Sequence, residues 1–221
     1  MDNFKICNML DLSHTIAAKL FEDKKYPFEA LPEIGAFLVA LGKTLDKAEF
    51  DQVQENVWVA KDAKVAKTAH LGGPLIIDKG AEIRHCAFIR GNAIIGKGAV
   101  VGNSTELKNV VLFDKVQVPH YNYVGDSILG YKAHMGAGSI TSNVKSDKTP
   151  VKIKGNGWEI DTGMKKVGAF LGNEVEIGCG SVLNPGTVIG PGSQVYPLSS
   201  VRGVVPAGSI YKKAGEIVAK R

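Results

Sequence analysis

Aliphatic residues return at every sixth position over much of this chain. One run begins at Val59 and a second begins at Leu171. Their members are Val59, Val65, Leu71, Ile77, Ile83, Ile89, Ile95, Val101, Leu107 and Phe113, then Leu171, Ile177, Leu183, Ile189, Val195 and Val201. The positions between them are mostly small, polar or glycine, so neither the 3.6-residue helical period nor simple alternation describes the pattern.

A six-residue period is typical of a hexapeptide-repeat β-helix. In such a solenoid each unit forms one short strand and one corner, and three units close a triangular coil. Successive coils stack at about 4.8 Å, the spacing of hydrogen-bonded strands, and the apolar residue of each unit points inward. The pattern therefore predicts an all-β solenoid, a parallel β-helix, over residues 51–210.

Residues 1–50 follow a helical pattern instead. A first amphipathic helix, capped by Asp11 or Ser13, would place four apolar residues on one face. These residues are Ile16, Ala17, Leu20 and Phe21. A second helix after Pro32 would bury Ile34, Phe37, Leu38 and Leu41 and stop at Gly42. We expect this α-helical segment to cap the open, edge-exposing end of the solenoid, the alternative being a docking surface for a protein partner.

The six-residue rhythm disappears in two other places. Residues 142–166 form a polar, basic excursion, and a long loop inside a regular repeat is more often functional than accidental, although a flexible decoration stays an alternative. Residues 211–221 combine two apolar side chains with several cations. They predict a short basic C-terminal helix, or a tail, over the other end of the solenoid.

Composition adds a preference for anionic ligands. The chain has 221 residues, 44% of them hydrophobic, and a formal net charge of +5. Positive charge favours small anionic substrates, coenzymes or nucleic acid. Nucleic acid is disfavoured because the cations are spread along the chain and Trp158 is the one aromatic residue among the lysines of the excursion.

Cysteine usage and hydropathy indicate a cytoplasmic protein with no membrane segment. Cys7, Cys86 and Cys179 are an odd number without close spacing, which argues against a disulfide framework and against a zinc site. No apolar stretch approaches the roughly 20 residues of a membrane span. The first residues also lack the cationic-then-apolar order of a signal peptide.

The most distinctive residues precede the excursion. Residues 120–126 read HYNYVGD and residues 135–143 read MGAGSITSN, while residues 89–91 read IRG and residues 101–108 read VGNSTELK. This collinear set resembles the acetyltransferase domain of the bifunctional glucosamine-1-phosphate N-acetyltransferase/N-acetylglucosamine-1-phosphate uridyltransferase family, within the hexapeptide-repeat acyltransferases. The resemblance covers about residues 80–210. It implies a left-handed coil and a homotrimer with active sites between subunits.

The same resemblance implies transfer of an acetyl group from acetyl-CoA to the amine of a phosphorylated amino sugar, with no metal. His120 would be the general base, since imidazole titrates near neutral pH. Glu106 would lie beside that ring and orient it. The backbone amide of Ala137 would stabilise the oxyanion of the tetrahedral intermediate. Uridylyl transfer is not expected, because residues 1–58 contain no Gly-rich phosphate loop.

Binding roles follow from the same matches. Arg90 and Lys108 would hold the sugar phosphate, for which a guanidinium fork and a point charge are suitable. Further contacts to the acceptor sugar would come from Tyr123, His134 and Asn143. The coenzyme would be bound by Ala137, Cys179, Pro197, Lys212 and Lys213.

Each of these assignments has a simpler alternative. His120 would then be a corner residue bonded to a neighbouring loop, and Arg90 and Lys108 solvated corner charges. Gly136 and Gly138 suit tight corners whether or not an oxyanion is bound. A buried small side chain is the favoured interpretation of Cys179 over a nucleophile.

Three departures from the family affect the acceptor and coenzyme grooves. They are Val144 in place of a tyrosine, Pro197 in place of a small alanine, and the longer excursion. His14, His70 and His85 are interpreted as structural. The alternative function is a non-catalytic module that binds a sugar nucleotide or phosphosugar, or that serves for oligomerisation.

Overall fold

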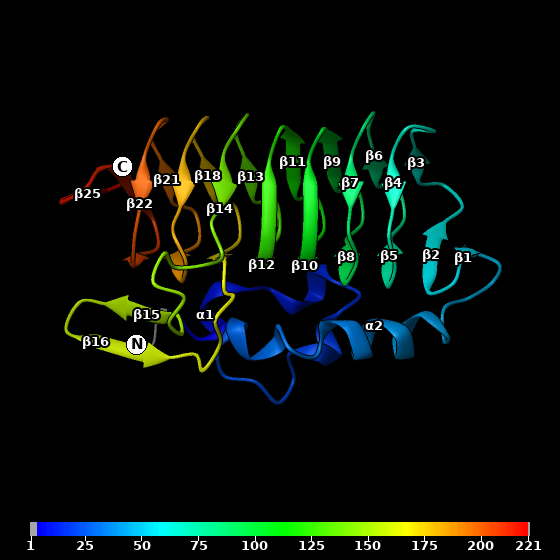
Figure 1. Cartoon of the computed structure of the whole chain (residues 1–221), viewed down its shortest axis with the longest axis horizontal. Helices are drawn as coiled ribbons and strands as arrows, with labels where there is room; N and C mark the ends of the chain where they lie inside the picture. Colours follow the sequence, from blue (N-terminus) through cyan, green and yellow to red (C-terminus); the bar gives the residue numbers. More distant parts are fainter. Residues whose placement is uncertain (1–3, 221) are drawn as a thin grey trace.

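The computed structural model describes residues 4–220, so residues 1–3 and Arg221 of the two predicted terminal segments lie outside the described residues. The chain forms a left-handed parallel β-helix of about nine turns, seen side-on in Figure 1. Each coil contributes a strand to each of three faces. The first face contains β2 (Val57–Ala60), β5 (Leu75–Ile77), β8 (Ala93–Ile95), the ends of β10 (Glu106–Leu112) and β12 (Tyr123–Leu129), β17 (Ala169–Leu171), β20 (Thr187–Ile189) and β23 (Val204–Val205).

The other two faces follow in chain order around each coil. The second face contains β3 (Lys64–Val65), β6 (Glu82–Ile83), β9 (Val100–Asn103), β11 (Gln117–His120), β13 (His134–Met135), β18 (Glu176–Ile177), β21 (Gln194–Val195) and β24 (Ser209–Lys213). The third face contains β4 (His70–Leu71), β7 (Phe88–Ile89), the first halves of β10 and β12, β14 (Ile140–Thr141), β19 (Val182–Leu183) and β22 (Ser200–Val201).

The strand register confirms that six residues make one side of a coil. Val59 pairs with Ile77, and Ile77 pairs with Ile95, a step of 18 residues. In the second run Leu171 pairs with Ile189 at the same step. The repeat is therefore three hexapeptides per turn, as the hydrophobic pattern predicts.

Two corners between the third and first faces are one residue short. Ile95 pairs with Leu112 rather than with Phe113, so the expected last member of the first run is wrong by one position, although Phe113 is buried. The backbone turns at these corners through left-handed residues, Asn109 (φ 56°) and Asp126 (φ 47°). β10 and β12 consequently run without a break from the third face to the first.

The N-terminal segment contains α1 (Ile6–Met9), η2 (Leu12–His14), η3 (Ala18–Leu20), η4 (Pro27–Ala30) and α2 (Ile34–Gly42). The second predicted helix is confirmed as α2. The first is wrong, because the chain forms only a 3₁₀ turn at Ala18–Leu20. Side chains of Asp11 and Thr15 accept hydrogen bonds from nearby backbone amides at 3.0 and 3.1 Å, and such local bonds compete with a helix.

This segment lies along the first face and does not cap an end of the solenoid, as Figure 1 shows. Successive residues of a strand point to opposite sides, yet first-face strands such as Leu75–Ile77 and Ala93–Ile95 are buried at every position. The outer side chains are covered laterally, with Phe21 packed on Phe113 at 5.7 Å between ring centroids. The predicted end cap is therefore wrong, and β1 (Phe50–Gln54), antiparallel to β2, lies at that end instead.

The excursion folds into a hairpin of β15 (Lys152–Gly155) and β16 (Trp158–Asp161), joined by Asn156 and Gly157. The C-terminal segment is also a hairpin, of β24 and β25 (Glu216–Ala219), so the predicted basic helix is wrong. Tyr211 pairs with Val195 and continues the second face, which fixes this segment as a strand. Within the described residues, no helix is long and apolar enough to cross a membrane.

Candidate functional site

The candidate residues gather around the third face and its two edges. We call the corner between the second and third faces the His120 edge, and the corner between the third and first faces the Asp126 edge. The strands of the third face stack Phe88, Glu106, Tyr123 and Ile140 in register, one residue per coil. Residues on both edges therefore flank one continuous surface.

The His120 edge places the predicted base and the predicted oxyanion donor on adjacent coils. The amide of Gly138 donates to the carbonyl of His120 at 3.0 Å, and the amide of Gly180 donates to the carbonyl of Ala137 at 2.8 Å. The next coil continues this ladder, because Leu198 N donates to Cys179 O at 2.9 Å. His120, Ala137, Cys179 and Pro197 thus lie along one edge, in chain order.

The side chains on this edge are open to solvent. His120 is exposed, and its ring has no hydrogen-bond partner within residues 4–220. The alternative interpretation of His120, a structural corner residue whose ring is bonded to a neighbouring loop, is therefore wrong. Cys179 is exposed as well, so its expected burial is wrong, because the side chain at this corner faces outward.

Asn122 fixes the backbone between His120 and Ala137, and the sequence prediction missed it. This side chain is 2% exposed. Its Nδ2 donates to the carbonyls of Gly136 at 2.9 Å and Ser139 at 3.0 Å, while its Oδ1 accepts from His120 N at 3.1 Å. A buried asparagine bonded to two successive corners sets their separation. The sequence could have indicated Asn122 as a site residue, because it lies between the predicted site residues His120 and Tyr123.

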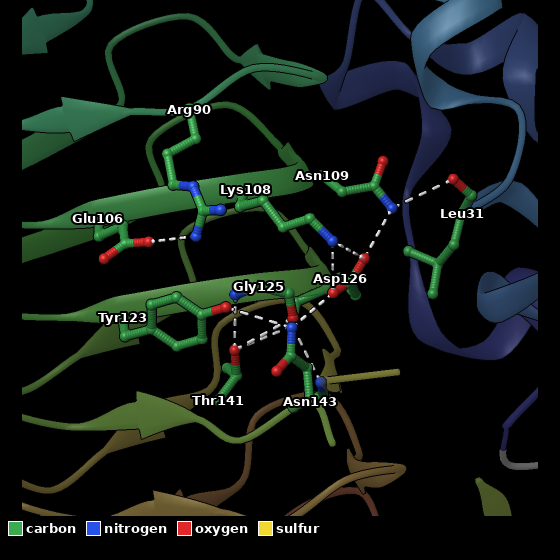
Figure 2. A network of polar contacts seen from close by, with 12 residues as sticks. Leu31, Arg90, Glu106, Lys108, Asn109, Tyr123, Gly125, Asp126, Thr141 and Asn143 are labelled. Carbon is green, nitrogen blue, oxygen red and sulfur yellow. Dashed lines mark hydrogen bonds and ion pairs between the residues drawn. The ribbon is translucent and has the colours of Figure 1, made fainter. Parts of the chain in front are cut away.

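Asp126 is the centre of a polar network on the other edge. Figure 2 shows Lys108 and Asn109 of β10, and Asn143 after β14, converging on its carboxylate. Lys108 Nζ lies 2.9 and 3.1 Å from the two oxygens, and Asn109 Nδ2 and Asn143 Nδ2 donate at 3.0 and 2.6 Å. The Asp126 side chain is 5% exposed. Its four hydrogen bonds satisfy the charge that burial would otherwise penalise.

Tyr123 extends this network onto the third face. Asn143 Nδ2 donates to the Tyr123 hydroxyl at 3.2 Å. Burial, followed by the negative charge of Asp126, raises the pKa of the Tyr123 phenol. The phenol therefore stays protonated and can donate a hydrogen bond to a ligand oxygen at neutral pH.

Glu106 contacts Arg90 and not His120. Arg90 Nη1 donates to Glu106 Oε1 at 2.9 Å, and this hydrogen bond raises the pKa of the guanidinium. No hydrogen bond joins Glu106 to the imidazole of His120 in the described part of the chain, so the expected orienting contact is absent. The predicted phosphate ligands Arg90 and Lys108 are thus each paired with a carboxylate of this chain.

Three predicted binding residues lie apart from this surface. His134 is on the second face, where its Nδ1 lies 2.7 Å from Glu176 Oε2. Lys212 and Lys213 belong to the C-terminal hairpin and lie 3.2 and 3.6 Å from the carboxylate of Glu216. One chain therefore does not bring His134 together with Tyr123 and the Asp126 network.

The arrangement provides an exposed imidazole, a backbone turn one coil away and a buried carboxylate network beside a phenol. These groups suit proton abstraction, oxyanion stabilisation and hydrogen bonding to a polar acceptor. Among residues 4–220, no three His, Cys, Asp or Glu side chains come together as metal ligands.

Comparison with known proteins places this site in a family. The model described as the GMPPB C-terminal domain matches residues 71–189. A bifunctional sugar-1-phosphate nucleotidylyltransferase/acetyltransferase of Sulfurisphaera tokodaii is 33% identical over 112 residues, which cover 51% of this chain and 28% of that protein. The bifunctional protein GlmU of Methanococcus aeolicus is 31% identical over 199 residues, covering 81% of this chain and 48% of that protein.

Solved structures with similar coils include a hexapeptide transferase family protein from Anaplasma phagocytophilum, with 16% identity and a TM-score of 0.40 over 75% of this chain and 80% of that chain. The polySia-specific acetyltransferase NeuO has 13% identity and a TM-score of 0.46 over 76% and 88% of the two chains. The chain spans less than half the length of each of these two curated relatives. Since the family match covers more than half of the chain, this protein belongs to the GMPPB C-terminal domain family and is related to GlmU-type proteins.

Proposed function

We propose that this protein is an acyltransferase that moves an acetyl group from acetyl-CoA to the amine of a phosphorylated amino sugar. The observation that carries the proposal is the His120 edge. There an unpaired, exposed imidazole and the Ala137 corner lie on adjacent coils at a separation held by Asn122. The name of the Sulfurisphaera relative, a sugar-1-phosphate nucleotidylyltransferase and acetyltransferase, agrees with the proposal.

The reaction requires no redox partner. The amine nitrogen attacks the thioester carbonyl, the new C–N bond forms, and His120 accepts the proton that the nitrogen loses. The Ala137 amide stabilises the negatively charged oxygen of the tetrahedral intermediate. Collapse of that intermediate breaks the C–S bond, and His120 returns the proton to the departing thiolate of coenzyme A.

The acceptor lies on the third face in this proposal. Tyr123 and Asn143 contact the sugar hydroxyls, and Arg90 and Lys108 contribute positive charge for the phosphate. The coenzyme runs along the His120 edge past Cys179 and Pro197 towards Lys212 and Lys213. That order follows the hydrogen-bonded ladder of the edge.

A homotrimer completes the site in this proposal. Tyr121 and Leu198, both on the His120 edge, are 65% and 85% exposed, which is unusual for large apolar side chains and suits an interface. Packing of this edge against a neighbouring subunit would also bring a second-face residue such as His134 towards the acceptor. Analytical ultracentrifugation should give three times the chain mass of 23.5 kDa, and a monomer contradicts this assembly.

A thiol-release assay tests the activity. Wild type, His120→Ala and His70→Ala are compared with acetyl-CoA and a panel of amino-sugar phosphates. Loss of a general base should slow acetyl transfer by about 10²–10⁴-fold, while acetyl-CoA binding is unchanged. His70→Ala removes a histidine from β4, which lies on the third face but three coils away from Tyr123, and should have no effect. No acceptor-dependent thiol release by wild type across the panel contradicts the proposed reaction.

One observation favours the second candidate, a non-catalytic sugar-nucleotide or phosphosugar-binding module. Glu106 is engaged by Arg90 at 2.9 Å and does not orient His120. A module of this kind would bind the amino-sugar phosphate with equal affinity in wild type and His120→Ala, with no thiol release from either. Thiol release by wild type therefore distinguishes the acyltransferase from the binding module.

A further inference from the structure

The excursion hairpin is docked firmly on the Asp126 edge. Val151 and Ile153 are 1% and 0% exposed. Gly186 and Gly203, at φ 78° and 77°, form the corners beneath the hairpin. A Cβ on Gly203 would lie 2.8 Å from the carbonyl oxygen of Lys154, so this glycine allows the backbones to approach closely. The hairpin is a built part of the fold.

Docking encloses a cleft of about 420 Å³ between the hairpin and the solenoid corner. Its walls carry Lys145, Lys152, Lys154 and Arg202, around Pro185 and the two corner glycines. A second hollow of about 260 Å³ shares Lys145 and Arg202 and reaches Ser142 and Val144, on either side of Asn143. The cleft therefore begins where the Asp126 network ends.

The cations of this cleft exceed their carboxylate partners. Lys152 is paired with Glu159 at 2.6 Å, and Lys145 lies 3.3 Å from Asp147. Arg202 and Lys154 have no carboxylate within ion-pair distance in the described residues. Asp161 lies opposite Lys152 in the hairpin as a third carboxylate, so the four cations still leave the cleft with a net positive charge.

We propose that this cleft binds a phosphate or diphosphate group. A phosphate monoester carries about −1.5 to −2 charges at pH 7, so the net positive charge of the cleft favours it. A guanidinium fork together with ammonium point charges is the combination that binds phosphate oxygens well. Arg90 and Lys108 are paired with Glu106 and Asp126, whereas Arg202 and Lys154 of the cleft have no such carboxylate in the described residues.

The site takes its ligand from one of two sources with the same chemistry. One is the phosphate or diphosphate of the acceptor, which would then lie in the cleft instead of beside Arg90 and Lys108, with the sugar reaching Asn143 and Tyr123. The other is the diphosphate of coenzyme A, whose course would then differ from the one proposed along the His120 edge. Anion binding in the cleft does not depend on the proposed reaction. Only the choice between the two sources of the phosphate rests on that reaction.

Isothermal titration calorimetry with inorganic pyrophosphate tests the site directly. Wild type should bind saturably, and Arg202→Gln and Lys154→Gln should each raise Kd about tenfold or more, since each removes a charge-assisted hydrogen bond. Lys67→Gln is the matched control. It removes the same charge from an exposed residue between β3 and β4 and should leave Kd unchanged.

A second variant tests the shape of the cleft independently of its charge. Gly203→Ala keeps every cation but displaces the hairpin, and it should also weaken pyrophosphate binding. Competition by a nucleoside diphosphate or by coenzyme A supports the site and identifies the source of the phosphate. Absence of saturable binding to wild type, or an unchanged Kd in both charge variants with native circular dichroism, overturns the inference.

Failure of this inference is distinguishable from failure of the proposed reaction. If acetyl transfer occurs but pyrophosphate binding ignores Arg202 and Lys154, the cleft inference is wrong and the reaction stands. If pyrophosphate binding depends on those residues but no thiol is released, the cleft stands and the reaction is wrong.

Discussion

Replacing Asp126 by Asn keeps the size of the side chain and removes one charge from the centre of the Figure 2 network. Both carboxylate oxygens accept hydrogen bonds, from Lys108 and Asn109 on one side and from Lys108 and Asn143 on the other. Whichever way the new amide is oriented, its NH₂ group therefore faces a donor. Asn tolerates the left-handed backbone of this corner, so backbone strain does not enter the comparison.

The magnitude follows from the burial of the pair. Removing one partner of a buried ion pair costs about 3–5 kcal/mol. Asp126 is 5% exposed but Lys108 is 28% exposed, so the ammonium recovers part of its hydration in the variant. We therefore expect the lower end of that range, about 3 kcal/mol of lost unfolding free energy. The variant should fold, because the hydrophobic positions of the coil are untouched.

Equilibrium unfolding in urea, followed by tryptophan fluorescence at one fixed protein concentration, measures this loss. Lys108→Met in a double-mutant cycle with Asp126→Asn isolates the pair itself, and a coupling of about 1–3 kcal/mol is expected. Glu159→Gln is the control, because the Lys152–Glu159 pair is shorter, at 2.6 Å, but its side chains are 42% and 50% exposed. A loss below about 1 kcal/mol for Asp126→Asn refutes this account of the network.

Three further predictions concern the coil, its cover and the His120 edge. Asp78 is buried with no hydrogen-bond partner on Oδ2, and burial raises its pKa above 3.8. The native carboxyl therefore becomes less destabilising as the pH falls through its folded-state pKa. Asp78→Asn should accordingly raise the unfolding free energy at pH 7 and lose that advantage near pH 4, whereas an equal difference at both pH values contradicts it. Ile94→Ala should cost about 3 kcal/mol in urea unfolding, because this outer first-face residue is 0% exposed, while the exposed Val53→Ala should not change it. Gly136→Ala should lower thiol release without loss of fold, since its Cβ would lie 2.7 Å from Cys179 N and must displace the Ala137 turn; unchanged turnover would show that the turn is not part of the site.

The coil could be predicted from sequence because one residue in each hexapeptide must point into the coil and must be apolar. Val59, Ile77 and Ile95 must point inward at each turn, so their spacing reveals the register directly. The lateral cover was predictable in principle as well, since Ile76 and Ile94 add an apolar outer residue to strands whose inner residues are already apolar. A six-residue pattern does not predict that the corners at Asn109 and Asp126 are one residue short. The short corner at Asn109 places Leu112 at the inward position expected for Phe113.

The candidate site was predicted in part for the same reason. His120 and Ala137 are one shortened coil apart, so sequence separation alone brings their corners together. Contacts between side chains on different coils depend on competition among neighbours, which spacing does not resolve. Glu106 had both Arg90 and His120 as candidate partners, and it pairs with the guanidinium. The hairpin of the excursion had a local signal in Asn156-Gly157, a dipeptide typical of tight hairpin turns.

The short corners also explain why an N-terminal segment that is not part of any coil belongs to the site. Asn109 and Asp126 occupy the two left-handed corner positions, and their side chains bond each other at 3.0 Å. The same Asn109 Nδ2 lies 3.3 Å from the carbonyl oxygen of Leu31, next to α2. Leu31, Asn109, Asp126 and Asn143 consequently form one hydrogen-bonded path from the lateral cover to the mouth of the cationic cleft. A cover docked only by apolar contacts could slide along the first face, whereas this directional bond ties it to the coil on which the candidate acceptor residues lie.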